Sequence, residues 1–106
     1  MNQVKVGSYT GTGAAINVSL GFVPDYVRII NAADGDVASE WFSGMADGSA
    51  YTLAGGTDAD ASLDTGNQVS AYAGSTTEGP GFTVGTDLSE NGKTFRYVAL
   101  RNVAGA

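Results

Sequence analysis

The stretch GFTVGTDLSENGKTFRYVALR, Gly81 to Arg101, holds two alternating apolar runs joined by the clearest turn signal in the chain. Between the runs, Asn91-Gly92 supplies two residues that tolerate the positive φ angles of a tight turn. The stretch therefore predicts a β-hairpin, onto which the rest of the chain builds.

The second run of this stretch is apolar on both of its faces. An extended strand places alternate residues on opposite sides, Phe95, Tyr97 and Ala99 on one and Arg96, Val98 and Leu100 on the other. A strand that is covered on only one side would carry polar residues at every second position. We therefore expect this strand to lie inside a sheet with cover over each face, or with one face in a subunit contact.

Alternation elsewhere predicts further short strands and an antiparallel sheet. The expected strands are Val4 to Tyr9, Ala14 to Leu20, Tyr26 to Ile30, Val37 to Ser43, Tyr51 to Leu53 and Gln68 to Ala73. The polar, glycine-rich segment Gly55 to Gly66 is expected to be an exposed loop without regular structure. Seven to eight short strands at this spacing are typical of a β-sandwich or a small barrel.

Length and composition limit the architecture to one domain. A chain of 106 residues, with 16 glycines and no cysteine, can bury one core and forms no disulfide. Abundant Ala, Ser, Thr and Val, with few Leu, Lys, Glu and Gln, argue against helices. We predict an all-β fold, a small antiparallel β-sandwich or barrel-like (jelly-roll-like) single domain over residues 1–106.

Charge and hydropathy exclude two classes of partner. Five basic against eleven acidic residues give a net charge of −6, and the cations form no run. Sequence-independent nucleic-acid binding needs clustered cations, so we expect no nucleic acid partner. The N-terminal residues Met1 to Val6 lack a signal-peptide pattern, and no 18-residue apolar run follows. We expect a soluble protein without an export signal and without a membrane partner.

The residue inventory also argues against catalysis. Without histidine or cysteine, the chain has no usual nucleophile triad, no imidazole base and no common zinc ligand set. A glycosidase would need only carboxylates such as Glu40, Asp47, Glu78 and Asp87. We interpret these as solvating charges of an acidic protein. We predict no enzyme, no catalytic residue and no cofactor.

One loop has the spacing of a calcium site. Asp58, Asp60, Ser62 and Asp64 offer oxygens at alternate positions, as the first ligands of a calcium loop do. Leu63 stands where the sharp turn needs glycine, and Val69 stands where a bidentate glutamate closes the site. We therefore predict a solvated loop and no metal site.

Five residues are candidates for a partner interface: Arg28, Trp41, Phe42, Arg96 and Arg101. Trp41-Phe42 is the only adjacent pair of large aromatic residues, and it is either core or an interface anchor. The three arginines fall within expected strands. They either pair with carboxylates on a solvated face or meet an acidic partner surface.

Two segments resemble small β-domains of tailed-bacteriophage virion proteins. The C-terminal one is the segment Gly81 to Asp87, followed by a polar loop with Asn-Gly and the aromatic-alternating strand Thr94 to Arg101. The N-terminal one is a glycine-rich turn, Gly7 to Gly13, that leads into a strand and then the Gly-Phe-x-Pro corner at Gly21 to Pro24. Together they cover a third to a half of the chain.

This resemblance implies a virion structural protein. The first expectation is a capsid decoration or cement protein that binds the major capsid protein on the outer surface of the phage head, and that associates as a homotrimer. The alternative is a tail-fibre or receptor-binding domain that recognises carbohydrate, for which Trp41, Tyr51 and Tyr72 with nearby carboxylates would serve.

Overall fold

The computed structural model describes residues 3–54 and 60–102, which form eight strands and one short 3₁₀ helix. The elements are β1 (Gln3–Thr10), β2 (Ile16–Ser19), β3 (Tyr26–Asn31), β4 (Val37–Phe42), β5 (Ser49–Ala54), β6 (Asp60–Tyr72), β7 (Gly81–Val84), η1 (Thr86–Leu88) and β8 (Thr94–Arg101). No helix in these ranges has the length and apolar content needed to span a membrane.

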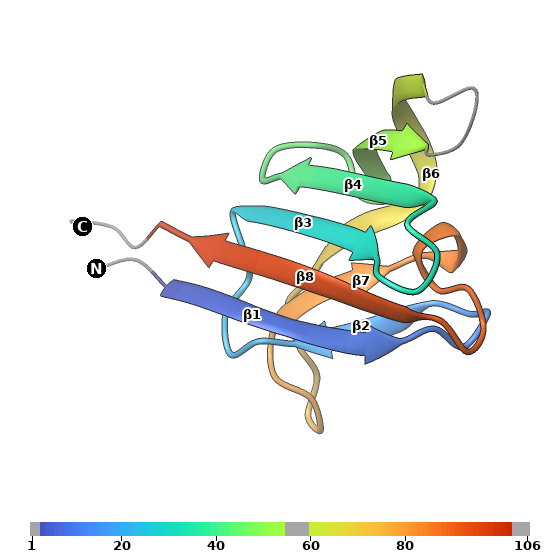
Figure 1. Cartoon of the computed structure of the whole chain (residues 1–106). Helices are drawn as coiled ribbons and strands as arrows, with labels where there is room; N and C mark the ends of the chain where they lie inside the picture. Colours follow the sequence, from blue (N-terminus) through green and yellow to red (C-terminus); the bar gives the residue numbers. More distant parts are fainter. Residues whose placement is uncertain (1–2, 55–59, 103–106) are drawn as a thin grey trace.

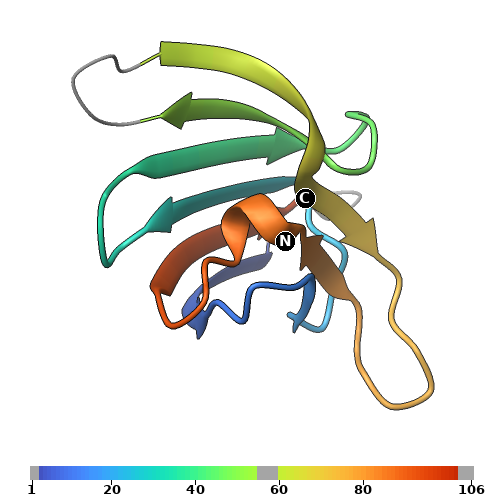
Figure 2. The same ribbon diagram turned by 90° about the vertical axis from the view of Figure 1, so that its right-hand side faces the viewer.

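All eight strands belong to one antiparallel sheet with the order β1-β8-β3-β4-β5-β6-β7-β2. The sheet curls until its two edge strands, β1 and β2, come near each other, so that it is a nearly closed barrel (Figure 1). The predicted all-β, antiparallel, barrel-like class is confirmed. Curling gives the sheet an inner face around the core and an outer face toward the surroundings (Figure 2).

The predicted hairpin within Gly81 to Arg101 is wrong, although its turn forms. The amide of Lys93 donates to the carbonyl oxygen of Glu90 across Asn91-Gly92, and Gly92 has a φ of 79°. However, β7 pairs with β2 and β6, whereas β8 lies between β1 and β3. The link between the two strands contains η1, whose Leu88 is fully buried, so this segment crosses the barrel and does not fold back on β7.

Strand β6 makes the largest bend in the sheet. Its first half pairs with β5 and its second half with β7, with a register shift on β5 between Ser49 and Ala50. At the bend Asn67 has a φ of 59°, which an L-residue adopts rarely but asparagine tolerates. The expected loop at Gly55 to Gly66 is therefore a strand from Asp60 onward, and residues 55–59 lie outside the described residues.

Aromatic side chains fill one end of the barrel interior. Tyr9 stacks on Phe95 with ring centroids 5.3 Å apart, and Phe82 meets the edge-on ring of Tyr97 at 5.3 Å. These contacts join β1 and β8 to β7 across the core. The buried apolar cluster comprises Val18, Leu20, Phe22, Val27, Ile29, Trp41, Val69, Phe82, Val84, Leu88, Phe95, Tyr97 and Ala99.

A buried polar network fills the interior beneath β4, β5 and β6. The hydroxyls of Ser39 and Thr52 lie 3.0 and 3.3 Å from Oε1 of Gln68, which accepts from them. The amide nitrogen Nε2 of Gln68 donates to Asp64 at 3.0 Å and to Asp87 at 3.3 Å. Hydrogen bonds to carboxylates are stronger than hydrogen bonds between neutral groups. The bond from Gln68 to Asp87 therefore holds the bend of β6 against η1.

Glycine is required where β7 passes β2. A Cβ at Gly81 would overlap the carbonyl oxygen of Val18, which is fixed backbone, whereas a Cβ at Gly79 would meet nothing within 4 Å. We predict that Gly81→Ala lowers the free energy of unfolding by about 3 kcal/mol, because the strand pair must separate to admit the methyl group. Chemical denaturation monitored by tryptophan fluorescence measures this, with Gly79→Ala as the matched control. Equal stability of the two variants would contradict the pairing of β2 with β7.

Candidate protein-binding face

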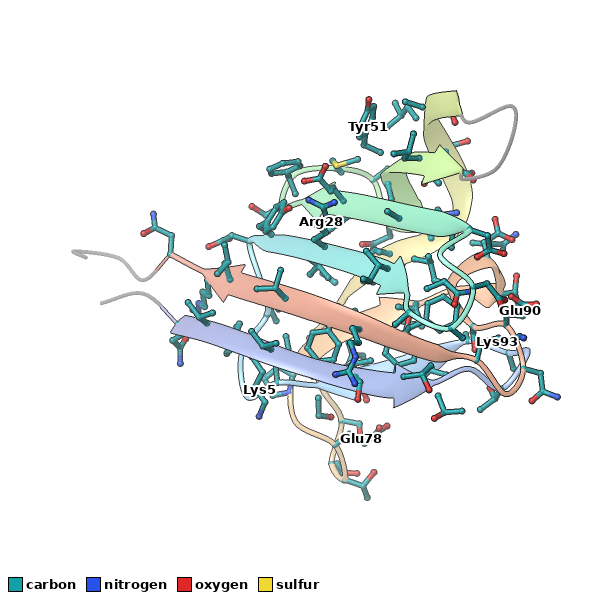
Figure 3. The ribbon with its side chains drawn as sticks, in the orientation of Figure 1. Lys5, Arg28, Tyr51, Glu78, Glu90 and Lys93 are labelled. Carbon is teal, nitrogen blue, oxygen red and sulfur yellow. The ribbon has the colours of Figure 1, made fainter. Side chains whose placement is uncertain are left out.

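The outer face of the sheet carries exposed large apolar side chains of the described chain. They are Val4, Val6, Ile30, Phe42, Tyr51, Leu53 and Leu63, with exposed fractions from 39% for Ile30 to 75% for Val6. We use the name outer face for the outward side of β1, β8, β3, β4, β5 and β6. Figure 3 labels two of its members, Arg28 and Tyr51. Large contiguous apolar patches on a soluble protein mark interaction sites.

Strand register makes these residues a continuous surface. Residues directly opposite each other in antiparallel strands point to the same side. One row of such neighbours runs Val6, Val98, Arg28, Glu40, Tyr51, Leu63, and the next runs Ser8, Arg96, Ile30, Ala38, Leu53, Ala61. A third, shorter row runs Val4, Leu100, Tyr26, Phe42. The face is thus apolar over six strands, with charges only near its middle.

Strand β5 places its large apolar side chains outward, and the polar Thr52 and the small Ala50 inward. Tyr51 and Leu53 are each 47% exposed, whereas Thr52 between them is 8% exposed and bonded to Gln68. Buried polar residues and exposed apolar patches are the informative departures from ordinary burial. On this strand the outward side chains suit contact with another molecule, while the inward side already has partners.

Three of the five predicted interface residues share the outer face, and two do not. Arg28, Phe42 and Arg96 point outward from β3, β4 and β8. Trp41 is 2% exposed and belongs to the core, as alternation requires for the neighbour of an exposed Phe42. Arg101 lies opposite Gln3 and lines a hollow at one end of the barrel.

Most of the outer face was not predicted from the sequence. Val4, Val6, Leu53 and Leu63 were not among the candidates, and Leu63 was placed in a loop. For Val4 and Val6 the sequence did carry a signal, because these two valines alternate with the charged Lys5. Choosing which side of such a strand faces the core requires the register, which the sequence alone does not give.

A short hydrogen bond organises the middle of the outer face. The hydroxyl of Tyr26 donates to Oε2 of Glu40 at 2.6 Å, and the ring of Tyr26 lies 5.0 Å from that of Phe42. Burial, followed by the hydrogen bond to Glu40 and its negative charge, raises the pKa of Tyr26 to about 12. Elsewhere, burial raises the pKa of Tyr9, whose hydroxyl donates to Leu88, and that of Tyr97.

A second surface feature is a hollow of about 650 Å³ at one end of the barrel. Loops 21–25 and 43–47 and the ends of the β6–β7 connection surround it, with Trp41 and Arg101 among its lining residues. Asp25 accepts from the amide of Asn102, and Asp47 from that of Ala71. Within the described chain, Nε1 of Trp41 is a buried donor without a hydrogen-bond partner.

The aromatic residues that a carbohydrate site would use are dispersed. Trp41 is buried, so neither face of its ring is available for a sugar to stack on. Tyr51 lies on the outer face, and Tyr72 donates from its hydroxyl to Glu78 beside the β6–β7 loop. These three residues therefore do not form one binding surface.

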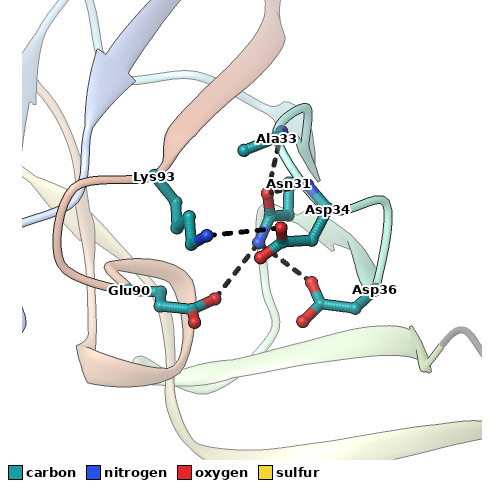
Figure 4. A network of polar contacts seen from close by, with 6 residues as sticks. All are labelled: Asn31, Ala33, Asp34, Asp36, Glu90 and Lys93. Atoms are coloured by element: carbon teal, nitrogen blue, oxygen red, sulfur yellow. Dashed lines mark hydrogen bonds and ion pairs between the residues drawn. The ribbon is translucent and has the colours of Figure 1, made fainter.

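Three carboxylates gather between the β3–β4 loop and the turn before β8, but they already have partners (Figure 4). The carboxylate oxygens of Asp34, Asp36 and Glu90 lie within 4.8 Å of one another, close enough to share a cation. The buried amide of Asn31 donates to Asp36 at 2.9 Å and to Glu90 at 3.4 Å, and Lys93 lies 3.4 Å from Asp34. These contacts join the β3–β4 loop to the turn before β8.

The residues of the expected calcium-like spacing are only partly described. Asp58 lies outside the described residues. Asp64 lies within β6, where its carboxylate accepts from the Gly66 amide and from Gln68. This carboxylate contributes to the interior of the bend.

Comparison with protein-family models, with curated proteins and with solved structures found no match to this chain.

The Tyr26–Glu40 bond can be tested by titration. We predict that Glu40→Gln lowers the pKa of Tyr26 from about 12 toward the usual value near 10, since it removes the charge and the anionic acceptor but leaves the burial. Ultraviolet difference titration, with Tyr26→Phe subtracted to isolate this residue, gives the value. Glu90→Gln, which removes a carboxylate elsewhere, should leave it unchanged. An unchanged titration in Glu40→Gln would mean that the bond is absent in solution.

Proposed function

We propose that this protein is a structural component of a tailed-bacteriophage virion. In this proposal it is a decoration or cement protein, without enzymatic activity, that binds the major capsid protein on the outside of the head. The observation that carries the proposal is the outer face, an apolar surface over six strands that no part of the described chain covers. Such a surface supplies binding energy when it is removed from water.

The segments that resemble virion domains support the proposal by their position. They include Gly7 to Thr10 of β1 and all of β8, which pair in the sheet, and β2 and β7, which pair with each other. Strands β3, β4, β5 and β6 extend the outer face with Ile30, Phe42, Tyr51, Leu53 and Leu63. The resemblance and the outer face thus share β8 and part of β1.

The physics of a shell suits a small binding module of this kind. A protein that binds only the intact shell stabilises it by mass action, and many symmetric copies multiply a modest energy per site. A net charge of −6 favours the outer surface over the interior, where packaged DNA would repel the protein.

The test uses purified shells that lack the protein. We predict regular density over the capsid lattice by electron microscopy and a raised disruption temperature on heating when the protein is added. The double variant Leu53→Ser with Leu63→Ser should bind at least about tenfold more weakly, because it removes apolar contact from the outer face. Thr76→Ala, an exposed change in the β6–β7 loop, is the control. Density only at the tail tip, or binding to bacterial surface glycans in place of shells, would favour the receptor-binding alternative.

We also predict that the protein associates as a trimer. β1 is an edge strand, and its Val4 and Val6 are 61% and 75% exposed, so its free edge and apolar side offer a contact between copies. We expect sedimentation equilibrium to give close to three times the 10.7 kDa of one chain. Val4→Ser with Val6→Ser should shift the protein toward monomer, whereas Ser8→Ala should not. A wild-type monomer at every concentration would contradict trimer formation in solution.

A further inference from the structure

Two arginines lie side by side near the middle of the outer face. Arg28 stands opposite Val98, and Arg96 stands opposite Ile30, so the two arginines are diagonal neighbours on the paired strands β3 and β8. Together with Tyr97 these four residues line a hollow of about 170 Å³. The hollow is thus lined by two arginines together with the apolar residues Ile30 and Val98.

Neither guanidinium has an ionic partner in the described chain. The ion pair found within 4 Å among the described residues is Lys93 with Asp34, on another part of the surface. Glu40 stands opposite Arg28, but its carboxylate accepts the hydroxyl of Tyr26 and makes no such pair with Arg28.

This placement is unfavourable for the isolated protein. The chain has eleven acidic residues to five basic ones, yet two of those cations are neighbours on an apolar surface without a carboxylate in contact. Like charges directly opposite each other destabilise a sheet, and the diagonal positions of these two arginines are within reach of long side chains. An interface that closed over them without a counter-charge would also leave two charges buried and unpaired, which is strongly unfavourable.

We propose that the hollow between Arg28 and Arg96 receives an aspartate or glutamate side chain of the partner protein. The inference rests on the proposed function, since it describes what the outer face recognises on its partner. Guanidinium groups match a carboxylate with two parallel hydrogen bonds, and Ile30 and Val98 would contact the methylene groups of the incoming side chain. Once the partner covers the hollow, the apolar surroundings exclude water and so strengthen the pair.

A carboxylate at this position would select the partner and fix the orientation of the complex. A surface that presents an apolar or basic residue to the hollow would be rejected, because the arginines would lose water and gain nothing. A second copy of this chain is a poor occupant of the hollow between Arg28 and Arg96. Two such faces in contact would bring four guanidinium groups against two Glu40 carboxylates that Tyr26 already engages.

Binding to shells at several salt concentrations tests the inference. The variant Arg28→Gln with Arg96→Gln should bind about a hundredfold more weakly than wild type and lose most of the salt dependence. Lys5→Gln with Arg101→Gln is the matched control, because it removes two cations from other exposed positions and should change binding by less than about threefold. Arg28→Lys with Arg96→Lys keeps the charge but not the planar fork and should be intermediate. Melting curves verify that each variant is folded.

The outcomes separate the inference from the function on which it rests. If wild type binds shells and the Arg28–Arg96 variant binds as the control does, the hollow does not receive a carboxylate and the proposed function stands. If wild type does not bind shells, the proposed function falls. In that case nuclear magnetic resonance titration with isobutyrate, a carboxylate with a small apolar tail, tests whether the hollow binds a carboxylate. Larger shifts of the Arg28 and Arg96 Nε–H signals than of the Arg101 signal support it, and equal shifts overturn it.

Discussion

A single sheet supplies the wall of this barrel and most of the side chains that fill its core, to which a loop and η1 add Leu20, Phe22 and Leu88. The inner side chains of β1, β7 and β8 meet across the interior, where Phe82 contacts Tyr97 and Tyr9 stacks on Phe95. A sheet that closes on itself has no second layer in the same chain to cover its outside. Apolar residues on the outer face are therefore available to another molecule.

Closure in turn depends on polar groups placed at one bend. Asn67 changes the direction of β6, and Gln68 next to it ties Ser39 and Thr52 of the neighbouring strands to Asp64 and Asp87. A fully satisfied buried network specifies one arrangement better than interchangeable apolar contacts do. It also occupies the inward side of β5 at Thr52, whereas the large apolar residues of that strand point outward. The pairing of β5 with β6 thus sets both the position of the bend and the side to which Tyr51 and Leu53 point.

Local alternation predicts strands well but not their partners. Val27 and Ile29 face inward, as alternation along the strand predicted at Tyr26 to Ile30 allows. The strand β8 is apolar on both sides, because one side packs in the core and the other lies on the outer face. The hairpin failed because the pairing of β7 and β8 is settled by contacts far apart in sequence and by the buried Leu88 between them. For Trp41-Phe42, a neighbouring pair must point to opposite sides, and only the register identifies which one is exposed.

Carbene labelling of the protein, free and bound to shells and read by mass spectrometry, measures whether the outer face is the binding surface. Binding should protect Phe42, Tyr51, Leu53 and Leu63, while the exposed loop residues Thr76 and Thr77 should be labelled equally in both states. Protection confined to loops 21–25 and 43–47 around the barrel-end hollow, with the outer face labelled as in the free protein, would contradict it.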